Sequence, residues 1–270
     1  MRHIRLLETP SRKEIAKRIK DIQGTSVKAL RMNEEEAVKR VVQMLRDVEK
    51  RLRIDIATLN PEDFKAIHLA KIQNLINEVM GDFENRSTNL IRAYSSQGMA
   101  LSTNFWHDVA HATRDIPNFS TIVPVLPDTI LAVTSNMAAE LIKGISSELR
   151  KQIVTTVQRA VLGAQTPFEA ARNISNFIGT RGGVGAVARA DTIVRTEINR
   201  AYNLADEFFR QDAVETRPVD LPALMKIWVT MNDGDRVRPS HRAMHKVTVE
   251  AGEPFDVPIV KVVKGVAVRV

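Results

Sequence analysis

The segment Met231–His241, MNDGDRVRPSH, gathers the side chains of this chain that are best suited to chemistry. Two Asp, two Arg, a Ser and a His fall within eleven residues, directly after the apolar run Ile227–Val229. Such a set can form a catalytic site, a metal site, an anion clamp or a polar network that holds a turn together. Which of these it forms depends on the elements that position it.

Catalysis at this segment would be centred on His241 with Asp235. The usual frame of nucleophilic hydrolysis is missing, because the chain has no G-x-S-x-G motif. Ser240 is adjacent to His241 in the sequence, where two side chains rarely point at each other. We therefore predict no catalytic residue and keep a hydrolase or transferase centred on His241 and Asp235 as an alternative.

Metal binding is suggested by two pairs of His that are spaced by four residues, His107 with His111 and His241 with His245. The first pair lies in HDVAH, which is similar to the zinc-binding helix H-E-x-x-H, but Asp108 is one methylene shorter than the Glu that acts there as a base. No spacing rule places a third ligand, and the chain has no cysteine to supply a thiolate. We predict neither a metal nor a cofactor.

A second polar motif, VRTEINRAYN, lies on a predicted helix that is otherwise rich in Ile, Val and Phe. Arg195, Asn199 and Tyr202 share one face of that helix, and Glu197 is three residues from Arg200, so the last two can form an ion pair. A polar stripe of this kind usually docks another element through hydrogen bonds. The candidates nearest along the chain are polar residues of the MNDGDRVRPSH segment: Asp233, Asp235, Arg236 and Arg238.

The elements that must position these motifs are mostly helices. Apolar residues at spacings of three and four predict a helix over 34–52, with Ala37, Val41, Met44, Leu45 and Val48 on one face. Similar patterns predict helices over 61–83, 87–113, 128–143, 147–162 and 186–211, with a break at Gly144 and a new cap at Ser146 or Ser147. Thr166, Pro167 and Glu169 predict a capping box at the start of a further helix that ends near Gly179.

The last 55 residues change character, and strands are predicted over 227–231, 246–249 and 266–270. The expected fold class is therefore mainly α, with an N-terminal helical bundle or helical hairpins followed by a helical body. A small C-terminal α+β or β-hairpin element completes it. No run of 18 apolar residues occurs, so we expect no membrane partner.

Positive charge is concentrated at one end of the chain. The net charge is +7, and residues 1–60 hold 15 Lys and Arg against 9 Asp and Glu. On a helix, Lys13, Lys17 and Lys20 form one stripe, with Ile15 and Ile19 on another face that can dock to protein. The stripe suits a DNA backbone or an acidic protein face, although a solvated helix face is an equally simple interpretation. The predicted contact residues are Arg12, Lys13, Lys17, Arg18 and Lys20.

The order of four segments resembles a known family. GAQTPFEAARNI, ARADTIVRTEINRAYNLA, KIWVTMNDGDRVRPSHRAM and GEPFDVP follow one another as in the phage Mu F-like family of minor head, or head-morphogenesis, proteins. The resemblance covers residues 135–260. It is carried by the Arg-Thr-Glu helix and, some 35 residues later, by Trp, Asp, Arg-x-Arg and Ser-His. The first 125 residues resemble no family that we can name.

The resemblance implies a structural protein of a tailed phage, not an enzyme. Such a protein is found at the portal vertex and capsid interior of the virion, after assembly in the host cytoplasm, and acts in head assembly or in DNA packaging and ejection. The implied partners are the portal protein, the major capsid or scaffolding protein, and phage double-stranded DNA bound without sequence specificity. The chain would then divide into a basic helical arm, a helical hairpin region and a Mu F-like head-morphogenesis domain, over residues 1–60, 61–125 and 126–270. Within the last, helices cover 128–212 and the β-containing element covers 225–270.

Under this resemblance the MNDGDRVRPSH segment becomes a structural polar network. Arg236 and Arg238 are two residues apart and leave a strand on the same side, so each can bind a carboxylate with two hydrogen bonds, and Glu197 is the expected partner. The functional alternative is that both Arg face a phosphate backbone. The predicted network comprises Arg195, Glu197, Trp228, Asp233, Asp235, Arg236, Arg238, Ser240 and His241.

Overall fold

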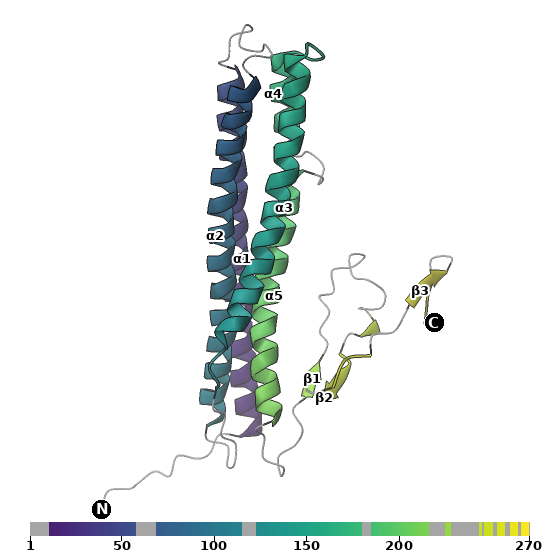
Figure 1. The fold of residues 1–270 in the computed structure, drawn as a ribbon. Coiled ribbons are helices and arrows are strands. Elements are labelled where there is room, and N and C mark those ends of the chain that lie inside the picture. Colours follow the sequence, from purple (N-terminus) through teal and green to yellow (C-terminus); the bar gives the residue numbers. More distant parts are fainter. Residues whose placement is uncertain are drawn as a thin grey trace, which may run out of the picture.

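The fold is mainly α, as predicted, and consists of five helices packed together (Figure 1). The computed structural model describes residues 11–57, 69–114, 123–179, 185–215, 225–227, 243–244, 246–250, 253–256, 260–263 and 266–269. The helices are α1 (Arg12–Ala57), α2 (Leu69–Thr113), α3 (Asp128–Val161), α4 (Pro167–Ile178) and α5 (Ala186–Glu215).

The helices form four antiparallel columns. Two contacts for each pair fix the directions. Arg51 on α1 lies against Glu78 on α2, while Asn33 lies against Tyr94. Arg92 on α2 lies against Asn136 on α3, while Met80 lies against Ser146. The fourth column is shared by α4 and α5, which follow one another beside α1 and α3. All five helices contribute to one hydrophobic core. The division into arm, hairpin region and domain stays a prediction, but the helices of all three parts pack on each other.

α2 and α5 approach each other closely at Gly98. A Cβ atom added at Gly98 would lie 3.1 Å from the backbone oxygen of Ile198. The neighbouring residues of this interface are also small and buried: Ser95 and Ser102 on α2, and Ala201 and Ala205 on α5. Small side chains let two helix backbones approach, so α5 packs against α1, α2 and α3 at once.

Two predicted helix breaks, between residues 83 and 87 and at Gly144, are wrong, and a serine near each of them bonds to a backbone carbonyl of a continuous helix. α2 runs unbroken through Ser87, whose Oγ donates to the carbonyl of Phe83 at 2.5 Å. α3 runs unbroken through Gly144, and the buried Ser146 donates from its Oγ to the carbonyl of Met80 on α2. A serine that bonds back along its own helix, or across to another, is compatible with a continuous helix.

Apolar residues recur at every fourth position of α3 from Met137 to Val161, but the buried stripe does not follow this run. The period-four run from Met137 to Val161 would wind round a straight helix, and its first two members, Met137 and Leu141, are exposed. Instead, burial follows steps of three and four residues, which keep one face toward the core. The buried stripe comprises Ala138, Ile142, Ile145, Leu149, Ile153, Val157 and Ala160.

The start of α4 was predicted in detail. The capping box at α4 is confirmed: the Thr166 hydroxyl accepts from the amide of Glu169, and the Glu169 carboxylate accepts from the amide of Thr166. The same arrangement joins Ser11 and Glu14 at the start of α1. These backbone hydrogen bonds lower the pKa of both glutamates, because they favour the charged carboxylate.

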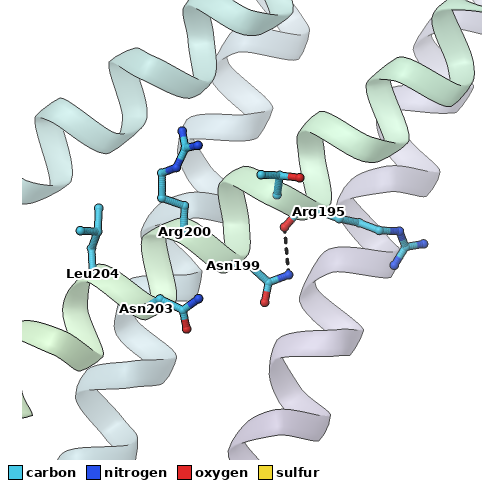
Figure 2. Close-up of a pocket in the computed structure, with 6 residues that line it drawn as sticks. Arg195, Asn199, Arg200, Asn203 and Leu204 are labelled. Carbon is cyan, nitrogen blue, oxygen red and sulfur yellow. Dashed lines mark hydrogen bonds between the residues drawn. The ribbon is translucent and has the colours of Figure 1, made fainter. Parts of the chain in front are cut away.

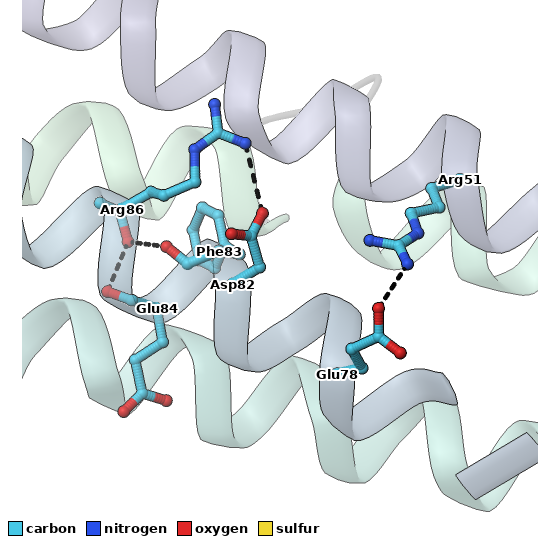
Figure 3. A network of polar contacts seen from close by, with 7 residues as sticks. Arg51, Glu78, Asp82, Phe83, Glu84 and Arg86 are labelled. Atoms are coloured by element: carbon cyan, nitrogen blue, oxygen red, sulfur yellow. Dashed lines mark hydrogen bonds and ion pairs between the residues drawn. The ribbon is translucent and has the colours of Figure 1, made fainter. Parts of the chain in front are cut away.

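Charged side chains bridge the outer surfaces of α1 and α2 (Figure 3). Arg51 reaches the carboxylate of Glu78 at 2.7 Å, and Arg86 pairs with Asp82 at 3.3 Å within α2. These side chains are well exposed, so water and salt screen them and their contribution to stability is small. The core beneath them holds the columns together.

The C-terminal strands form two antiparallel pairs, which Figure 1 draws apart from the bundle, on the side where α5 ends. β1 (Met225–Ile227) pairs with β2 (Thr248–Glu250), and β3 (Val260–Val263) pairs with β4 (Val266–Arg269). The strands predicted over 227–231, 246–249 and 266–270 are confirmed in part by β1, β2 and β4, with 228–231 outside the described residues, whereas β3 was not predicted. Its sequence, VKVV, is rich in β-branched residues and could have indicated it.

Candidate functional site: the polar face of α5

The Arg-Thr-Glu motif lies in the first half of α5, and the apolar pattern of the helix orients it. The buried positions recur every three or four residues along one face, as predicted. That face turns Arg195 and Asn199 toward α1 (Figure 2). Tyr202 also contacts α1, whereas Thr196 and Asn203 are exposed. The fully buried members of the apolar face are Ala190, Val194, Ile198, Ala201 and Ala205.

Glu34 on α1 is the centre of the contact with this face. The Asn199 amide donates to Glu34, and a guanidinium nitrogen of Arg195 lies 3.8 Å from the same carboxylate. Arg195 is also held by Asp191 at 2.9 Å. Burial raises the pKa of Glu34, while Asn199 and Arg195 act in the opposite direction. The carboxylate is therefore costly to bury but well paired.

Tyr202 extends the contact by one further turn of α5. Its hydroxyl lies 2.9 Å from the hydroxyl of the buried Ser26 on α1. Burial raises the pKa of Tyr202, with the hydrogen bond to Ser26 acting against it. We name this contact the α1–α5 seam; it comprises Ser26, Glu34, Arg195, Asn199 and Tyr202. The predicted docking of the polar stripe by hydrogen bonds is confirmed, and its partner in the described residues is α1.

Glu197, the acid of the motif, is deeply buried, with 1% of its surface exposed. Its carboxylate pairs with Arg200 at 2.8 Å, which confirms the pairing predicted from their spacing. Arg236 and Arg238, the partners that the resemblance implied, lie outside the described residues. Their pairing with Glu197 stays a prediction, and so does the rest of the network in that segment. The other network members outside the described residues are Trp228, Asp233, Asp235, Ser240 and His241.

A further polar contact, which was not predicted, joins α2 to α5 on the C-terminal side of the seam along α5. The indole nitrogen of the buried Trp106 donates to the Asp206 carboxylate at 2.9 Å. Burial raises the pKa of Asp206, and the bond from Trp106 and the charge of Arg210 act against it. The presence of Trp106 in an apolar helix was an available signal, because a buried indole N–H needs an acceptor.

The outer side of the motif forms an open hollow of about 590 Å³ (Figure 2). Its walls supply guanidinium and amide groups, one hydroxyl and one apolar side chain, and they include no carboxylate or imidazole that could act as a base. This lining suits contact with a polar surface better than a chemical reaction. The lining residues are Arg195, Thr196, Asn199, Arg200, Asn203 and Leu204.

The His pair on α2 lies elsewhere. His107 and His111 are both exposed, and an Arg114 nitrogen lies 3.1 Å from the His111 ring. Within the part of the chain that the structure describes, no three His, Asp or Glu side chains are grouped so that they could hold a metal ion. The second His pair, His241 with His245, lies outside that part.

The predicted basic stripe lies at the start of α1. Lys13, Lys17 and Lys20 are exposed, and none of them has an ion-pair partner among the described residues. Arg18 is exposed as well, while Arg12 belongs to α1 without a described side chain. The opposite face docks to the bundle as expected: Ile15 is buried and Ile19 is half-buried.

Comparison with known proteins provides no relative. Neither a protein-family model, nor a curated protein, nor a solved structure matches this chain. Among the helices described, none has a stretch long and apolar enough to span a bilayer.

Proposed function

We propose that this chain is a structural minor head protein of a tailed phage, acting at the portal vertex and the capsid interior in head assembly or in DNA packaging and ejection. The first support is the order of its motifs over residues 135–260, which resembles that of the phage Mu F-like family. The proposed partners are the portal protein and the major capsid or scaffolding protein. In this proposal the C-terminal strands belong to a small β-containing element of the same domain.

One observation carries the proposal from the structural side. The polar residues of the Arg-Thr-Glu helix are used to hold helices together: Arg195 and Asn199 bond to Glu34 on α1. The acid of the motif, Glu197, is buried and paired with Arg200. Polar side chains whose hydrogen-bonding groups are already paired within the bundle favour a scaffold role over a catalytic one.

The direct test is the composition of purified particles of the phage that encodes the chain. Cross-linking followed by mass spectrometry should detect the chain in mature heads at low copy, with cross-links to the portal protein. Heads that lack the chain at every stage of assembly would overturn the proposal.

The enzymatic alternative can be separated with two variants of the full chain. His241→Ala and Asp235→Asn should enter particles and support infection as the wild-type chain does. A folded His241→Ala chain that enters particles but abolishes infection would favour the hydrolase or transferase centred on His241 and Asp235.

Non-specific binding of duplex DNA is a second candidate function, and the exposed stripe of Lys13, Lys17 and Lys20 favours it. Each phosphate contact releases counterions, so the logarithm of the affinity falls with the logarithm of salt by about 0.9 per contact. Changing all three lysines to Gln should weaken binding and reduce this slope. The matched control changes the exposed Lys28, Lys71 and Lys151 to Gln. Equal losses in the two triple variants would show that the stripe is not a binding site.

A further inference from the structure

A second surface lies far from the α5 motif, where α4 packs on the C-terminal half of α1. Here the two helices border an open groove of about 780 Å³. Four cationic side chains line it, together with apolar and small polar groups. The lining residues on which the argument rests are Arg46, Lys50, Arg53, Ile54, Phe168 and Arg172.

The charge of the groove is unbalanced. Glu49 is the one carboxylate among the lining residues, and it pairs with Arg53 at 3.8 Å. Arg46, Lys50 and Arg172 are exposed, and none of the three has a carboxylate partner among the described residues. Three unpaired cations along one groove attract an acidic ligand and disfavour a basic one.

The groove also has exposed apolar side chains. Phe168, on the first turn of α4, is 78% exposed, and Ile54 on α1 is 51% exposed. A phenyl ring held on a well-capped helix gains most of its burial energy only when a partner covers it. Exposed aromatic and arginine side chains at one place are also the residue types that dominate protein interfaces.

The spacing of these groups matches a helix. Arg46, Lys50 and Arg53 follow steps of four and three residues on α1, and Phe168 and Arg172 are four residues apart on α4. The row of three cations on α1, with Arg172 on α4 and the apolar Ile54 and Phe168 beside them, complements a helix that carries an apolar stripe flanked by carboxylates. We propose that the α1–α4 groove is the docking site for an acidic amphipathic helix of a partner protein. This inference does not depend on the assignment to a phage head.

Nucleic acid fits the groove less well than an acidic helix. Duplex phosphates would satisfy the cations but would leave Phe168 and Ile54 uncovered. Stacking of single-stranded bases usually uses several aromatic side chains, and the lining of this groove offers one. Binding of duplex DNA is therefore an outcome of the test and not part of the proposal.

The experiment measures fluorescence anisotropy of the full chain with a labelled synthetic peptide. The peptide carries Leu at helical spacings of three and four and Glu at the flanking positions, and a second peptide carries Lys in place of every Glu. The Glu peptide should bind, more weakly as salt rises, and the Lys peptide should not. Saturable binding of both peptides, or of neither, would overturn the proposal.

Two variants test the place of binding. Phe168→Ala should weaken binding of the Glu peptide about tenfold, as expected for loss of an aromatic anchor. Lys50→Gln combined with Arg172→Gln should weaken it to a similar degree and reduce its salt dependence. The matched controls are Val133→Ala, which truncates another exposed apolar residue, and Lys28→Gln with Lys151→Gln, which removes two charges elsewhere.

The controls should bind the Glu peptide as the wild-type chain does. Equal affinity of the groove variants and the controls would overturn the proposal, because binding would then lie elsewhere. Duplex DNA is the alternative occupant. If DNA competes with the Glu peptide, and if DNA competes equally well in the Phe168→Ala chain but no longer binds the charge variant, the groove is assigned to nucleic acid instead.

Discussion

The two helices of the fourth column differ in how many neighbours they have. α5 packs against α1, α2 and α3, and the small residues at Gly98 let α2 approach it closely. α4 has only 12 residues and packs mainly against α1 and α3. Phe209 on α5 is accordingly buried, while Phe168 on α4 points into the open groove. The same residue type therefore serves the core in one helix and is left for a partner in the other.

The comparison shows that position in the bundle, not composition, decides what a side chain does. Both helices are amphipathic. The polar side chains of α5 that face the bundle are satisfied within the chain, through the α1–α5 seam and the Trp106–Asp206 bond. Three of the four cations around α4, Arg46, Lys50 and Arg172, find no such partner among the described residues. The α5 half should therefore carry stability, and the α4 half should carry recognition.

The largest difference is expected between the two phenylalanines. Phe209→Ala removes a side chain of which only 2% is exposed, and it should reduce the free energy of unfolding by about 3–5 kcal/mol. Phe168→Ala should change it by less than about 0.5 kcal/mol. Chemical denaturation of the two full-length variants measures both values. Similar losses would break the comparison, because Phe168 would then have to be part of a core.

Two glycines give the next largest effect. Gly98→Val places a branched side chain against the backbone of Ile198 and should destabilise the bundle by about 1–3 kcal/mol through overpacking. Gly144→Val is the matched control on α3, where a Cβ atom meets nothing within 4 Å. It should stabilise slightly, by about 0.3 kcal/mol, because Val is a better helix former than Gly. If the two variants melt alike, the close approach of α2 and α5 is not needed for stability.

The pH dependence should have opposite signs in the two halves. Burial raises the folded-state pKa of Asp206, so from its unfolded value near 3.8 upward the folded chain binds more protons than the unfolded one, and this group lowers stability as pH rises. Asp206→Asn keeps an acceptor for Trp106 and removes this titration. Its stability relative to wild type should rise with pH through that window, as measured by urea denaturation at a series of pH values.

Glu169 at the start of α4 provides the contrast. Its pKa is lowered by the backbone amide of Thr166, so its contribution is present above the unfolded value of 4.5 and is lost as pH falls through the folded pKa. Glu169→Gln should therefore lose stability relative to wild type near neutral pH and approach it in acid. The same sign of change in both variants would contradict the assigned causes.

The smallest effect is expected at the surface ion pair between α1 and α2. Arg51→Ala removes the contact with Glu78 and should cost about 0.2–1 kcal/mol, because both side chains are well exposed. The loss should disappear in concentrated salt, which screens exposed charges. A larger loss that persists in salt would mean that Arg51 contributes through packing of its hydrocarbon chain.

Local features of this fold could be predicted from the sequence, because neighbours along the chain determine them. The capping box of Thr166 and Glu169, the apolar stripe of α1 and the pair Glu197–Arg200 all depend on residues within one or two turns. The unbroken α2 and α3 could not be predicted. Whether Ser146 caps a new helix or bonds to α2 depends on a residue 66 positions away.

The candidate site shows the same limit. The polar stripe of α5 indicated that a partner exists, but not which one, and Glu34 lies 165 residues from Asn199. The missed groove was hidden for a related reason, since Arg46 and Arg172 look like ordinary solvated charges until α1 and α4 are placed side by side. Burial and pairing of charges are properties of the packed bundle.

The unbroken length of α1 has a mechanical consequence. Lys17, in the basic stripe, and Lys50, in the groove, lie 33 positions apart on one helix, which corresponds to about 50 Å at 1.5 Å per residue. Because α2, α4 and α5 pack against this helix, it cannot bend to bring both surfaces to one small partner. The bundle is therefore stiff, with the basic stripe near one end and the α1–α4 groove near the other. Partners bound at both surfaces would be held at a fixed separation.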